Sequence, residues 1–346
     1  MNNLYTSKIY IDELKSLQND DIFSKFDGKS VLLSGGTGLI LSYFIDVILL
    51  NKDLNVKIYV ITRNIENAKQ RFSYFINDNR LTFIEGDVNS NININLKSLD
   101  YVISGASKTD PLNYSKYPVE VLIDNIFGCY NLIKIALKYK STFLLLSSCE
   151  VYGINNDSIL NEDSKSIINI LENRSSYNLA KMSSENMCIN FMKEYDLKTK
   201  IIRFSRIFGP TLKSTDTKAL SQFLFSGING QNIVLKSKGE QKFSYQYVGD
   251  AVRAISYVLL KESDNVVFNS TNDEVYKLKE LASFIAKECN VNVIFQINDE
   301  FSGTGYSKAI NSILSINKLK NIGFNNKFNI KYALYDTIKI FKEIKK

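Results

Sequence analysis

One tyrosine and one lysine offer the clearest chemistry in this sequence. Tyr177 and Lys181 are four residues apart, which places both side chains on one face of a helix, one turn from each other. An ammonium group there can stabilise the phenolate and lower the tyrosine pKa from its usual value of about 10, so that the tyrosine can take a proton from a hydroxyl group. The spacing alone is weak evidence because it occurs four times: Tyr130/Lys134, Tyr177/Lys181, Tyr257/Lys261 and Tyr335/Lys339.

The surroundings of Tyr177 distinguish this pair from the other three. An apolar run of strand length, 142–147, leads directly into Ser148, Cys149 and Glu150, and Tyr177 follows Ser148 by 29 residues (177 − 148). That separation leaves room for a substrate loop before the helix. We therefore expect Ser148 to hydrogen-bond the reacting oxygen, Tyr177 to act as the base and Lys181 to tune its pKa.

The composition excludes several other kinds of active site. The 346 residues contain no histidine, which rules out a Ser-His-Asp triad, a Cys-His dyad and zinc held by histidine. The four cysteines are spread widely without close pairs, so neither a disulfide framework nor a zinc cluster is expected. Acid–base chemistry must use Tyr, Lys, Glu, Asp, Cys or a hydroxyl group, and we predict no metal site.

The charge pattern favours neither a nucleic acid nor a membrane as partner. The net charge of +7 suits an anionic ligand, but the lysines are dispersed and often lie near acids. No nucleic-acid-binding motif is present. The most apolar early stretch, 39–50, is too short to span a bilayer, and 1–15 lacks the pattern of a secretory signal. We expect a cytoplasmic protein.

A glycine-rich turn, 34–40, follows the first apolar strand and opens a helix. Its glycines let the backbone turn sharply and approach a pyrophosphate, while the helix N-terminus offers free N–H groups and a positive dipole end. This position between strand and helix predicts a dinucleotide-phosphate site. The residues expected to contact it are Gly35, Thr37, Gly38, Leu39 and Ile40.

Apolar runs of strand length alternate with helix-period segments over the first two-thirds of the chain, which predicts an α/β fold with a doubly wound parallel sheet. After Pro210 the pattern changes to short strands mixed with helices, as expected for a smaller substrate lobe with some segments returning to the first domain. We predict a helical extension over 1–28, a dinucleotide-binding domain over 29–210 and the substrate lobe mainly over 211–346. The expected strands of the sheet are 30–34, 57–62, 81–85, 100–104, 142–147 and 200–204.

These motifs together resemble the extended short-chain dehydrogenases/reductases, the NAD-dependent epimerase/dehydratase family, over roughly residues 29–341. Gly35 and Gly38 match the first two glycines of that family's GxxGxxG loop, whereas Leu41 replaces the third and should widen the helix–strand contact. The resemblance implies a Rossmann fold, a nucleotide-diphosphate sugar as substrate, and a homodimer formed by the helices around 119–138 and 177–193. It also implies that Lys181 holds the nicotinamide ribose.

The resemblance carries further cofactor-binding positions. The acid that usually bonds the ribose of NAD is replaced by Thr62-Arg63-Asn64, and an arginine can pair with a 2′-phosphate, so NAD and NADP both remain open. The other family positions fall on residues after the third and fourth strands and in the following helix: Asp87 and Val88 near the adenine, Ala106 and Ser107 beside the nicotinamide ribose, and Asn125.

Two departures affect the expected substrate site. Arg206 stands where the family usually has asparagine in an "R-x-x-N-x-Y-G-P" segment, and Phe243 stands where it usually has the arginine that grips the diphosphate. Arg206, Lys238 or Lys242 is expected to supply the missing charge, although a lysine lacks the bidentate fork. Cys149 is also expected to contact the substrate.

Cys149 and Glu150 bear on the type of reaction. Family dehydratases carry Asp-Glu at these positions, and decarboxylases keep the glutamate after a small residue, so Ser-Cys-Glu-Val-Tyr-Gly resembles the decarboxylase form most closely. The implied reaction is oxidation of the sugar at C4 and return of the hydride after decarboxylation or dehydration assisted by Glu150. A 4-epimerase or an NADP-dependent 4-keto reductase is the alternative, and a non-catalytic dinucleotide-binding protein is a third reading.

Overall fold

The apolar strands expected from the sequence form one parallel sheet in the computed structural model, which describes residues 3–109, 111–155, 157–297 and 311–345. The strand order is β10-β6-β5-β4-β1-β2-β3, and every neighbouring pair is parallel. This confirms the doubly wound α/β class. The strands are β1 (Ser30–Ser34), β2 (Lys57–Thr62), β3 (Leu81–Glu85), β4 (Tyr101–Ser104), β5 (Thr142–Ser148), β6 (Thr199–Phe204) and β10 (Val267–Ser270).

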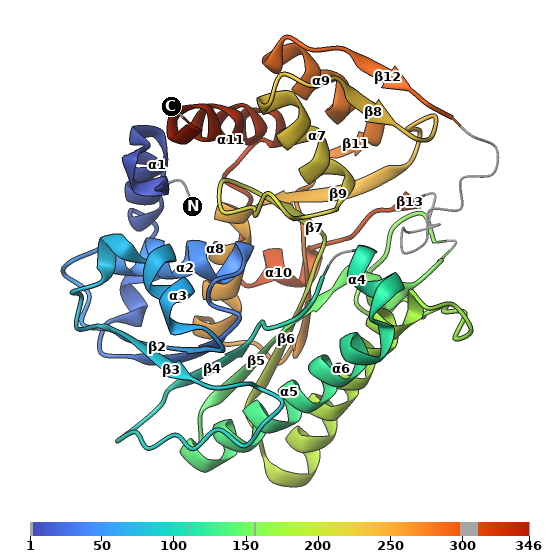
Figure 1. Ribbon diagram of the computed structural model, residues 1–346. Coiled ribbons are helices and arrows are strands. Elements are labelled where there is room, and N and C mark those ends of the chain that lie inside the picture. The colour runs from blue at the N-terminus through green and yellow to red at the C-terminus, as the bar shows by residue number, and fades with distance from the viewer. Residues whose placement is uncertain (1–2, 110, 156, 298–310, 346) are drawn as a thin grey trace.

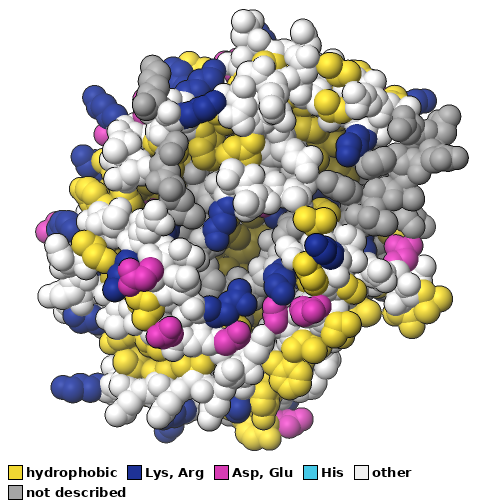
Figure 2. Space-filling view, in the orientation of Figure 1, with side chains coloured by type: hydrophobic (Ala, Val, Ile, Leu, Met, Phe, Trp, Pro, Cys, Tyr) yellow, Lys and Arg dark blue, Asp and Glu magenta, His cyan; other side chains and the backbone are white. Residues whose placement is uncertain are grey.

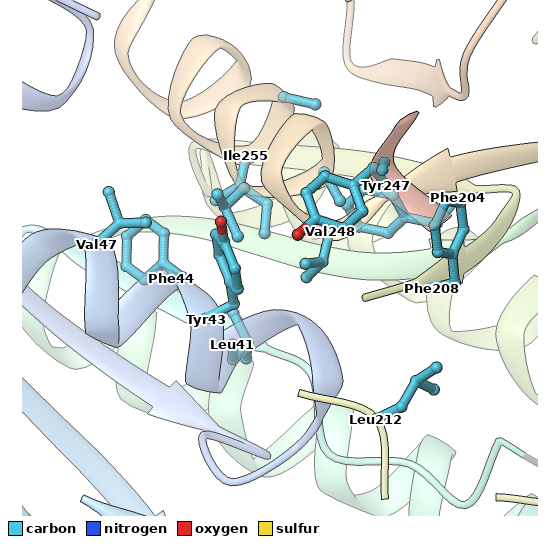
Figure 3. Packing of buried hydrophobic residues seen from close by; sticks show 14 of the residues in the cluster. Leu41, Tyr43, Phe44, Val47, Phe204, Phe208, Leu212, Tyr247, Val248 and Ile255 are labelled. Atoms are coloured by element: carbon cyan, nitrogen blue, oxygen red, sulfur yellow. The ribbon is translucent and has the colours of Figure 1, made fainter. Parts of the chain in front are cut away.

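Helices cover both faces of this sheet (Figure 1). Because successive side chains of a strand point to opposite faces, Leu33 joins a core with α2 (Leu39–Leu50) and α8 (Val248–Leu260), whereas Leu32 joins one with α5 (Pro118–Tyr139) and α6 (Ser175–Tyr195). Figure 3 shows the first core, where Tyr43, Phe44 and Val47 of α2 face Val248 and Ile255 of α8. The shorter α3 (Ile65–Arg71) connects β2 to β3, and α4 (Pro111–Lys116) precedes α5.

A smaller lobe stands at the carboxyl ends of the sheet strands. A four-stranded sheet contains β7 (Arg206–Phe208), β9 (Lys242–Tyr247), β11 (Val275–Lys277) and β13 (Asn311–Ser312), and a second small sheet pairs β8 (Ile233–Leu235) with β12 (Val293–Phe295). The helices α7 (Ala219–Ile228), α9 (Leu278–Cys289) and α11 (Ile330–Lys345) pack together beside these sheets, whereas α10 (Asn317–Asn321) packs against β10 of the main sheet. Two elements from the second part of the chain belong to the main sheet region: β10 is its edge strand beside β6, and α8 packs on its face. One hydrophobic cluster includes residues from both parts.

The N-terminal segment forms a helix, α1 (Lys8–Gln18), that packs against α2 and α11 (Figure 1). Tyr10, Leu14 and Leu17 are fully buried in the main core. Polar contacts hold the helix as well: Glu13 accepts hydrogen bonds from Tyr43 and Tyr247. The segment is therefore packed into the fold. Among the described residues, no helix combines the length and apolar character needed to cross a bilayer.

Candidate active site

A large cavity lies between the carboxyl ends of the sheet strands and the smaller lobe. Its volume is about 1460 Å³, more than the roughly 300–1,000 Å³ of a single small-molecule site, so it has room for two ligands. Figure 2 shows a hollow near the centre of one face with basic side chains around its rim. Ligands of open α/β sheets bind at this edge. The lining includes Gly35, Ser148, Glu150, Tyr177 and Lys181.

The glycine-rich turn has the geometry of a phosphate cradle. Gly35 adopts φ +75°, and a Cβ there would lie 2.7 Å from the backbone of Gly105, so only glycine fits. The N–H of Gly38 donates to the Gly35 carbonyl at 2.9 Å, and Gly38 starts α2 without a side-chain cap. The uncapped start of α2 therefore borders the cavity, which Leu39 and Ile40 line, and this position fits a dinucleotide pyrophosphate.

Leu41, at the third glycine position, is accommodated by a second glycine. Its side chain is buried, and a Cβ on Gly105 would lie 2.6 Å from the Leu41 Cδ1 atom. The hydroxyl of Ser34 accepts hydrogen bonds from the N–H groups of Gly105 and Ala106, each at 3.1 Å. The backbone after β4 is therefore fixed close to β1, and the absent Cβ of Gly105 leaves the room that Leu41 takes.

The remaining cofactor candidates are distributed around the cradle. Ser107 lines the cavity, whereas Arg63 is exposed at the end of β2 and is not among the lining residues. The Asp87 carboxylate accepts from the N–H of Asn89 at 2.9 Å. Asn125 is buried in α5 and donates to the Val121 carbonyl, but its own side-chain oxygen has no hydrogen-bond partner within the described part of the chain. Thr37, Val88 and Ala106 are not among the residues that line the cavity.

Tyr177 and Ser148 meet at the floor of the cavity. Ser148 ends β5, and Tyr177 lies in the first turns of α6 with its ring stacked on Tyr114 of α4 at 4.7 Å. Burial raises the pKa of the Tyr177 phenol, and a hydrogen bond with Ser148 lowers it only in part. The phenol is thus neutral here, whereas the sequence led us to expect that Lys181 would lower its pKa.

Lys181 is held one turn further on. Its Nζ donates to the Leu146 carbonyl at 3.0 Å and lies 5.8 Å from the centre of the Tyr177 ring. Burial lowers the pKa of Lys181 to about 8, against smaller opposing effects of Cys129 and Glu185. In each of the other three Tyr-x-x-x-Lys pairs the lysine also lies over its tyrosine ring, but that lysine is exposed. Burial in the cavity therefore singles out Tyr177 and Lys181.

Glu150 stands beside Ser148 between two arginines. It belongs to the short helix η4 (Cys149–Tyr152), and its Oε2 accepts from Arg174 at 2.6 Å while its Oε1 lies 3.9 Å from Arg206. Burial acts to raise the Glu150 pKa, but Arg174 and then Arg206 outweigh it, so the pKa falls below its usual value. Burial raises the pKa of the neighbouring Cys149 thiol, which stays protonated. Arg174 was not anticipated, and its only signal was its place three residues before Tyr177.

Only some of the cations that we expected to bind the diphosphate of the substrate lie at the cavity. Arg206 lines the cavity, and its guanidinium lies 3.7 Å from the centre of the Phe243 ring. Lys242 is exposed at the start of β9 and is not among the lining residues, and neither is Lys238. Lys218 is a further lining cation that the sequence did not single out, and it pairs with Asp216 at 2.9 Å. Of the three cations proposed for the diphosphate, only Arg206 reaches the cavity.

Comparison with known proteins agrees with this geometry. UDP-glucuronic acid decarboxylase 1 of Xenopus tropicalis is 25% identical over 262 residues, which are 76% of this chain and 61% of the frog protein. The chain thus spans about three fifths of that relative's length. Two solved structures share the fold. One is the UDP-glucuronic acid 4-epimerase of Bacillus cereus, solved with UDP-glucuronic acid and NAD. It superimposes with a TM-score of 0.78 at 18% sequence identity, and the matched region covers 90% of this chain and 99% of the epimerase chain. The dTDP-glucose 4,6-dehydratase of Streptomyces venezuelae has TM-score 0.79 and 18% identity and covers 91% of this chain and 97% of its own.

A model of one protein family matches residues 31–270, a span that includes the phosphate cradle, Ser148, Glu150, Tyr177, Lys181 and Arg206. That span is more than half of the chain. The protein belongs to the NAD dependent epimerase/dehydratase family.

Proposed function

We propose that this protein is an NAD-dependent enzyme that modifies the sugar of a nucleotide-diphosphate sugar, oxidising it at C4 and returning the hydride after decarboxylation. The observation that carries the proposal is the convergence of Ser148, Glu150, Tyr177 and Lys181 on one cavity that also contains the phosphate cradle. The names of the relatives, a UDP-glucuronic acid decarboxylase and a UDP-glucuronic acid 4-epimerase, support a nucleotide-linked sugar as substrate.

The cradle fits NAD because Gly35 has no side chain to block a close approach and the first turn of α2 has N–H groups without a side-chain cap, as a pyrophosphate requires. NAD, when bound, supplies the acceptor for the C4 hydride and later returns that hydride. The positive charge of its nicotinamide favours ionisation of Tyr177, an effect that the buried phenol needs. The exposed position of Arg63 provides no close contact that selects NADP.

Ser148, Tyr177 and Lys181 manage the proton on the sugar hydroxyl. The phenolate of Tyr177 accepts the proton from the C4 hydroxyl, and Ser148 donates a hydrogen bond to the resulting carbonyl oxygen. A 4-keto sugar with a carboxylate on C5 then loses carbon dioxide, leaving its electron pair in an enolate that takes up a proton at C5. Reduction at C4 completes the cycle as Tyr177 returns the proton to the oxygen.

Glu150 is suited to the step between oxidation and reduction at C4. Its ion pair with Arg174 keeps it ionised beside Ser148, so it enters the reaction as an acceptor of hydrogen bonds and protons. Such a carboxylate can orient the water that protonates C5, or take the C5 proton if the substrate eliminates water instead. Cys149 is a poor acid because burial raises the pKa of its thiol. Decarboxylation, which needs no acid at that position, is therefore favoured over dehydration.

The test is turnover of UDP-glucuronic acid by the purified protein supplied with NAD. We expect release of carbon dioxide and a UDP-pentose without net NADH, as shown by mass spectrometry. Tyr177→Phe should lower kcat by about 10²–10⁴ while keeping the dinucleotide bound. Tyr257→Phe, which removes a tyrosine of the same spacing outside the cavity, should leave kcat unchanged. Equal activity of the two variants, or failure to bind any pyridine nucleotide, would contradict the proposal.

A 4-epimerase or an NADP-dependent 4-keto reductase is the second candidate. Neither reaction needs the acid that dehydratases carry at the position of Cys149, whose buried thiol is a poor proton donor. An epimerase would return a product of unchanged mass, and a reductase would consume NADPH stoichiometrically. A non-catalytic protein would bind NAD without turnover.

We further propose a homodimer, because α5 presents an exposed apolar stripe. Val119, Ile123, Phe127 and Tyr130 are 63%, 41%, 52% and 40% exposed and follow helical spacing along one face. A second copy of the chain would cover them. The cytoplasmic location stays a prediction.

A further inference from the structure

Arg206 and Phe243 form a stacked pair in the wall of the cavity. They come from the neighbouring strands β7 and β9, which run parallel with Arg206 opposite Tyr245. The guanidinium carbon lies 3.7 Å from the centre of the Phe243 ring, which is the contact distance of a flat stack. Phe243 is 7% exposed and thus fixed by its surroundings. A guanidinium stacked in this way keeps its N–H edge available to a ligand.

That edge is not used by the residues that the structure describes. The Arg206 Nη1 atom is buried and has no hydrogen-bond partner there. The Nη2 atom lies 3.9 Å from Glu150, too far for a hydrogen bond, because that carboxylate is already engaged by Arg174 at 2.6 Å. Arg174 and Arg206 therefore face the same carboxylate, and the N–H groups of Arg206 stay able to donate hydrogen bonds to a ligand. A buried polar group left without a partner needs a ligand or water to compensate it.

The position of Arg206 indicates which part of a substrate it meets. Glu150, its nearest charged neighbour, donates its backbone N–H to the Ser148 hydroxyl at 3.3 Å, and Ser148 hydrogen-bonds Tyr177. The reacting carbon of the sugar must lie against Ser148 and Tyr177. Arg206 is thus at the reacting end of the cavity, beside the sugar and not beside the nucleoside.

We propose that Arg206, held flat by Phe243, binds a carboxylate carried by the sugar and so selects nucleotide-linked uronic acids over neutral sugars. The inference rests on the proposed function for the identity of the site and names its substrate class. A carboxylate matches the planar fork of an arginine with two parallel hydrogen bonds, which a lysine does not offer. A neutral sugar could offer Nη1 only an uncharged hydroxyl or ring oxygen, which makes a weaker hydrogen bond than a carboxylate.

The experiment measures equilibrium binding by calorimetry to NAD-loaded protein that carries Tyr177→Phe, so that no turnover occurs. The three ligands are UDP-glucuronic acid, UDP-glucose and UDP. We expect the parent to prefer UDP-glucuronic acid to UDP-glucose. Arg206→Gln should weaken binding of UDP-glucuronic acid by about 30-fold or more, and of UDP-glucose and UDP by less than about threefold. Lys242→Gln removes a cation on the adjoining strand outside the cavity and should change none of the three.

Arg206→Lys and Phe243→Leu provide the second line of test if Arg206→Gln folds poorly. Both should keep the protein folded and NAD-loaded while lowering the preference for UDP-glucuronic acid, because one loses the fork and the other the stacking surface. Equal weakening for all three ligands would overturn the inference and assign Arg206 to the diphosphate. Lack of preference in the parent would overturn it too. If the preference holds but the unmodified enzyme turns nothing over, the proposed reaction fails while the binding inference stands.

Discussion

Burial shifts the pKa values of the two proposed catalytic side chains, Tyr177 and Lys181, in opposite directions. It raises the pKa of the Tyr177 phenol and lowers the pKa of the Lys181 ammonium to about 8, because in both cases it disfavours the charged form. Burial thus favours the neutral phenol of Tyr177 and the neutral amine of Lys181. A cationic nicotinamide bound next to Tyr177 would favour the phenolate, and cofactor binding would then activate the base.

Lys181→Met should separate function from stability. Because the folded-state pKa of Lys181 is about 8 and its ordinary value is 10.5, the folded protein binds fewer protons than the unfolded chain between these values. The buried charge therefore destabilises the fold below pH 8, and the effect fades as pH rises toward 10.5. We expect the free energy of unfolding of the variant to exceed that of the parent by about 1–3 kcal/mol at pH 7, and this difference to shrink by pH 10. At the same time kcat should fall by about 10²–10⁴.

Urea unfolding at several pH values checks the stability part. Lys134→Met is the matched control, since Lys134 has the same spacing to a tyrosine but is exposed. A Lys181→Met protein that is less stable than the parent at pH 7 would show that the hydrogen bond to the Leu146 carbonyl outweighs the desolvation of the charge.

Glu150→Gln should uncouple the two stages of the reaction. The amide keeps the size of the side chain but removes the charge that pairs with Arg174, so it can neither accept a proton nor hold Arg174 as firmly. We expect a single-turnover rise of NADH absorbance near that of the parent, from C4 oxidation, and a drop of about 10²–10³ in carbon dioxide release. Equal loss of both stages would contradict the role assigned to Glu150.

At the scale of elements, the sheet could be predicted because each strand carries its own signal. A parallel strand buried on both faces reads as a continuous apolar run, and these runs in the sequence became β1 to β6 within a residue or two at each end. The phosphate cradle could be predicted for the same reason, because strand, glycines and helix are contiguous. Lys242 was a poor candidate for the substrate because it begins β9 at an exposed position, whereas Phe243 next to it is buried.

Contacts between distant segments could not be predicted from the sequence. Leu41 replaces a glycine, but the space it needs comes from Gly105, 64 residues later (105 − 41), and no local pattern links the two. The ion pair between Arg174 and Glu150 likewise joins the start of α6 to the short helix that follows β5. Such pairs depend on how β5, α6 and β7 meet at the cavity, which only the folded chain shows.

The docking of α1 should make stability depend on pH. Burial raises the pKa of Glu13 to about 7, against the hydrogen bonds from Tyr43 and Tyr247 that lower it. Its folded-state pKa lies above the unfolded value of 4.5, so the folded protein keeps a proton that the unfolded chain loses. This contribution is fully present below about pH 4.5 and is lost as pH rises through 7.

Glu13→Gln removes that dependence because the amide never ionises. Relative to the parent, the variant should gain about 2–3 kcal/mol of unfolding free energy between pH 5 and pH 8. Thermal and urea unfolding across this range measure the difference, and Glu120→Gln, at an exposed site on α5, should show no such trend. A constant difference between Glu13→Gln and the parent at every pH would refute the shifted titration.

At the scale of the whole molecule, hydrophobic packing is continuous across the predicted domain boundary near Pro210. A single hydrophobic cluster contains Phe204 of the main sheet, Tyr247 of the smaller lobe and Ile338 of α11. The cavity therefore lies within one continuous packed unit. Several of the lysines and arginines that produce the net charge of +7 line this cavity. Their position there favours binding of an anionic substrate over a role as ordinary solvated surface charges.

The exposed stripe on α5 leads to the last prediction. Figure 2 shows hydrophobic side chains gathered on the lower part of the face where Figure 1 places α5 and α6. Burying four large apolar side chains on each of two copies gives the association its driving force, roughly 25 cal/mol for each Å² removed from water. A charge in the middle of the stripe would have to be desolvated, so Phe127→Lys should convert a dimer into a monomer.

Light scattering coupled to size-exclusion chromatography measures the mass directly. Tyr332→Lys is the matched control, because Tyr332 is 65% exposed on α11, at a distance from α5, and should leave the mass unchanged. The Phe127→Lys monomer should stay folded, since Phe127 is 52% exposed and contributes little to the core of its own chain. Because α5 and α6 pack together and α6 carries Tyr177, loss of the dimer should also lower activity. An unmodified protein that runs as a monomer would refute the role of this face.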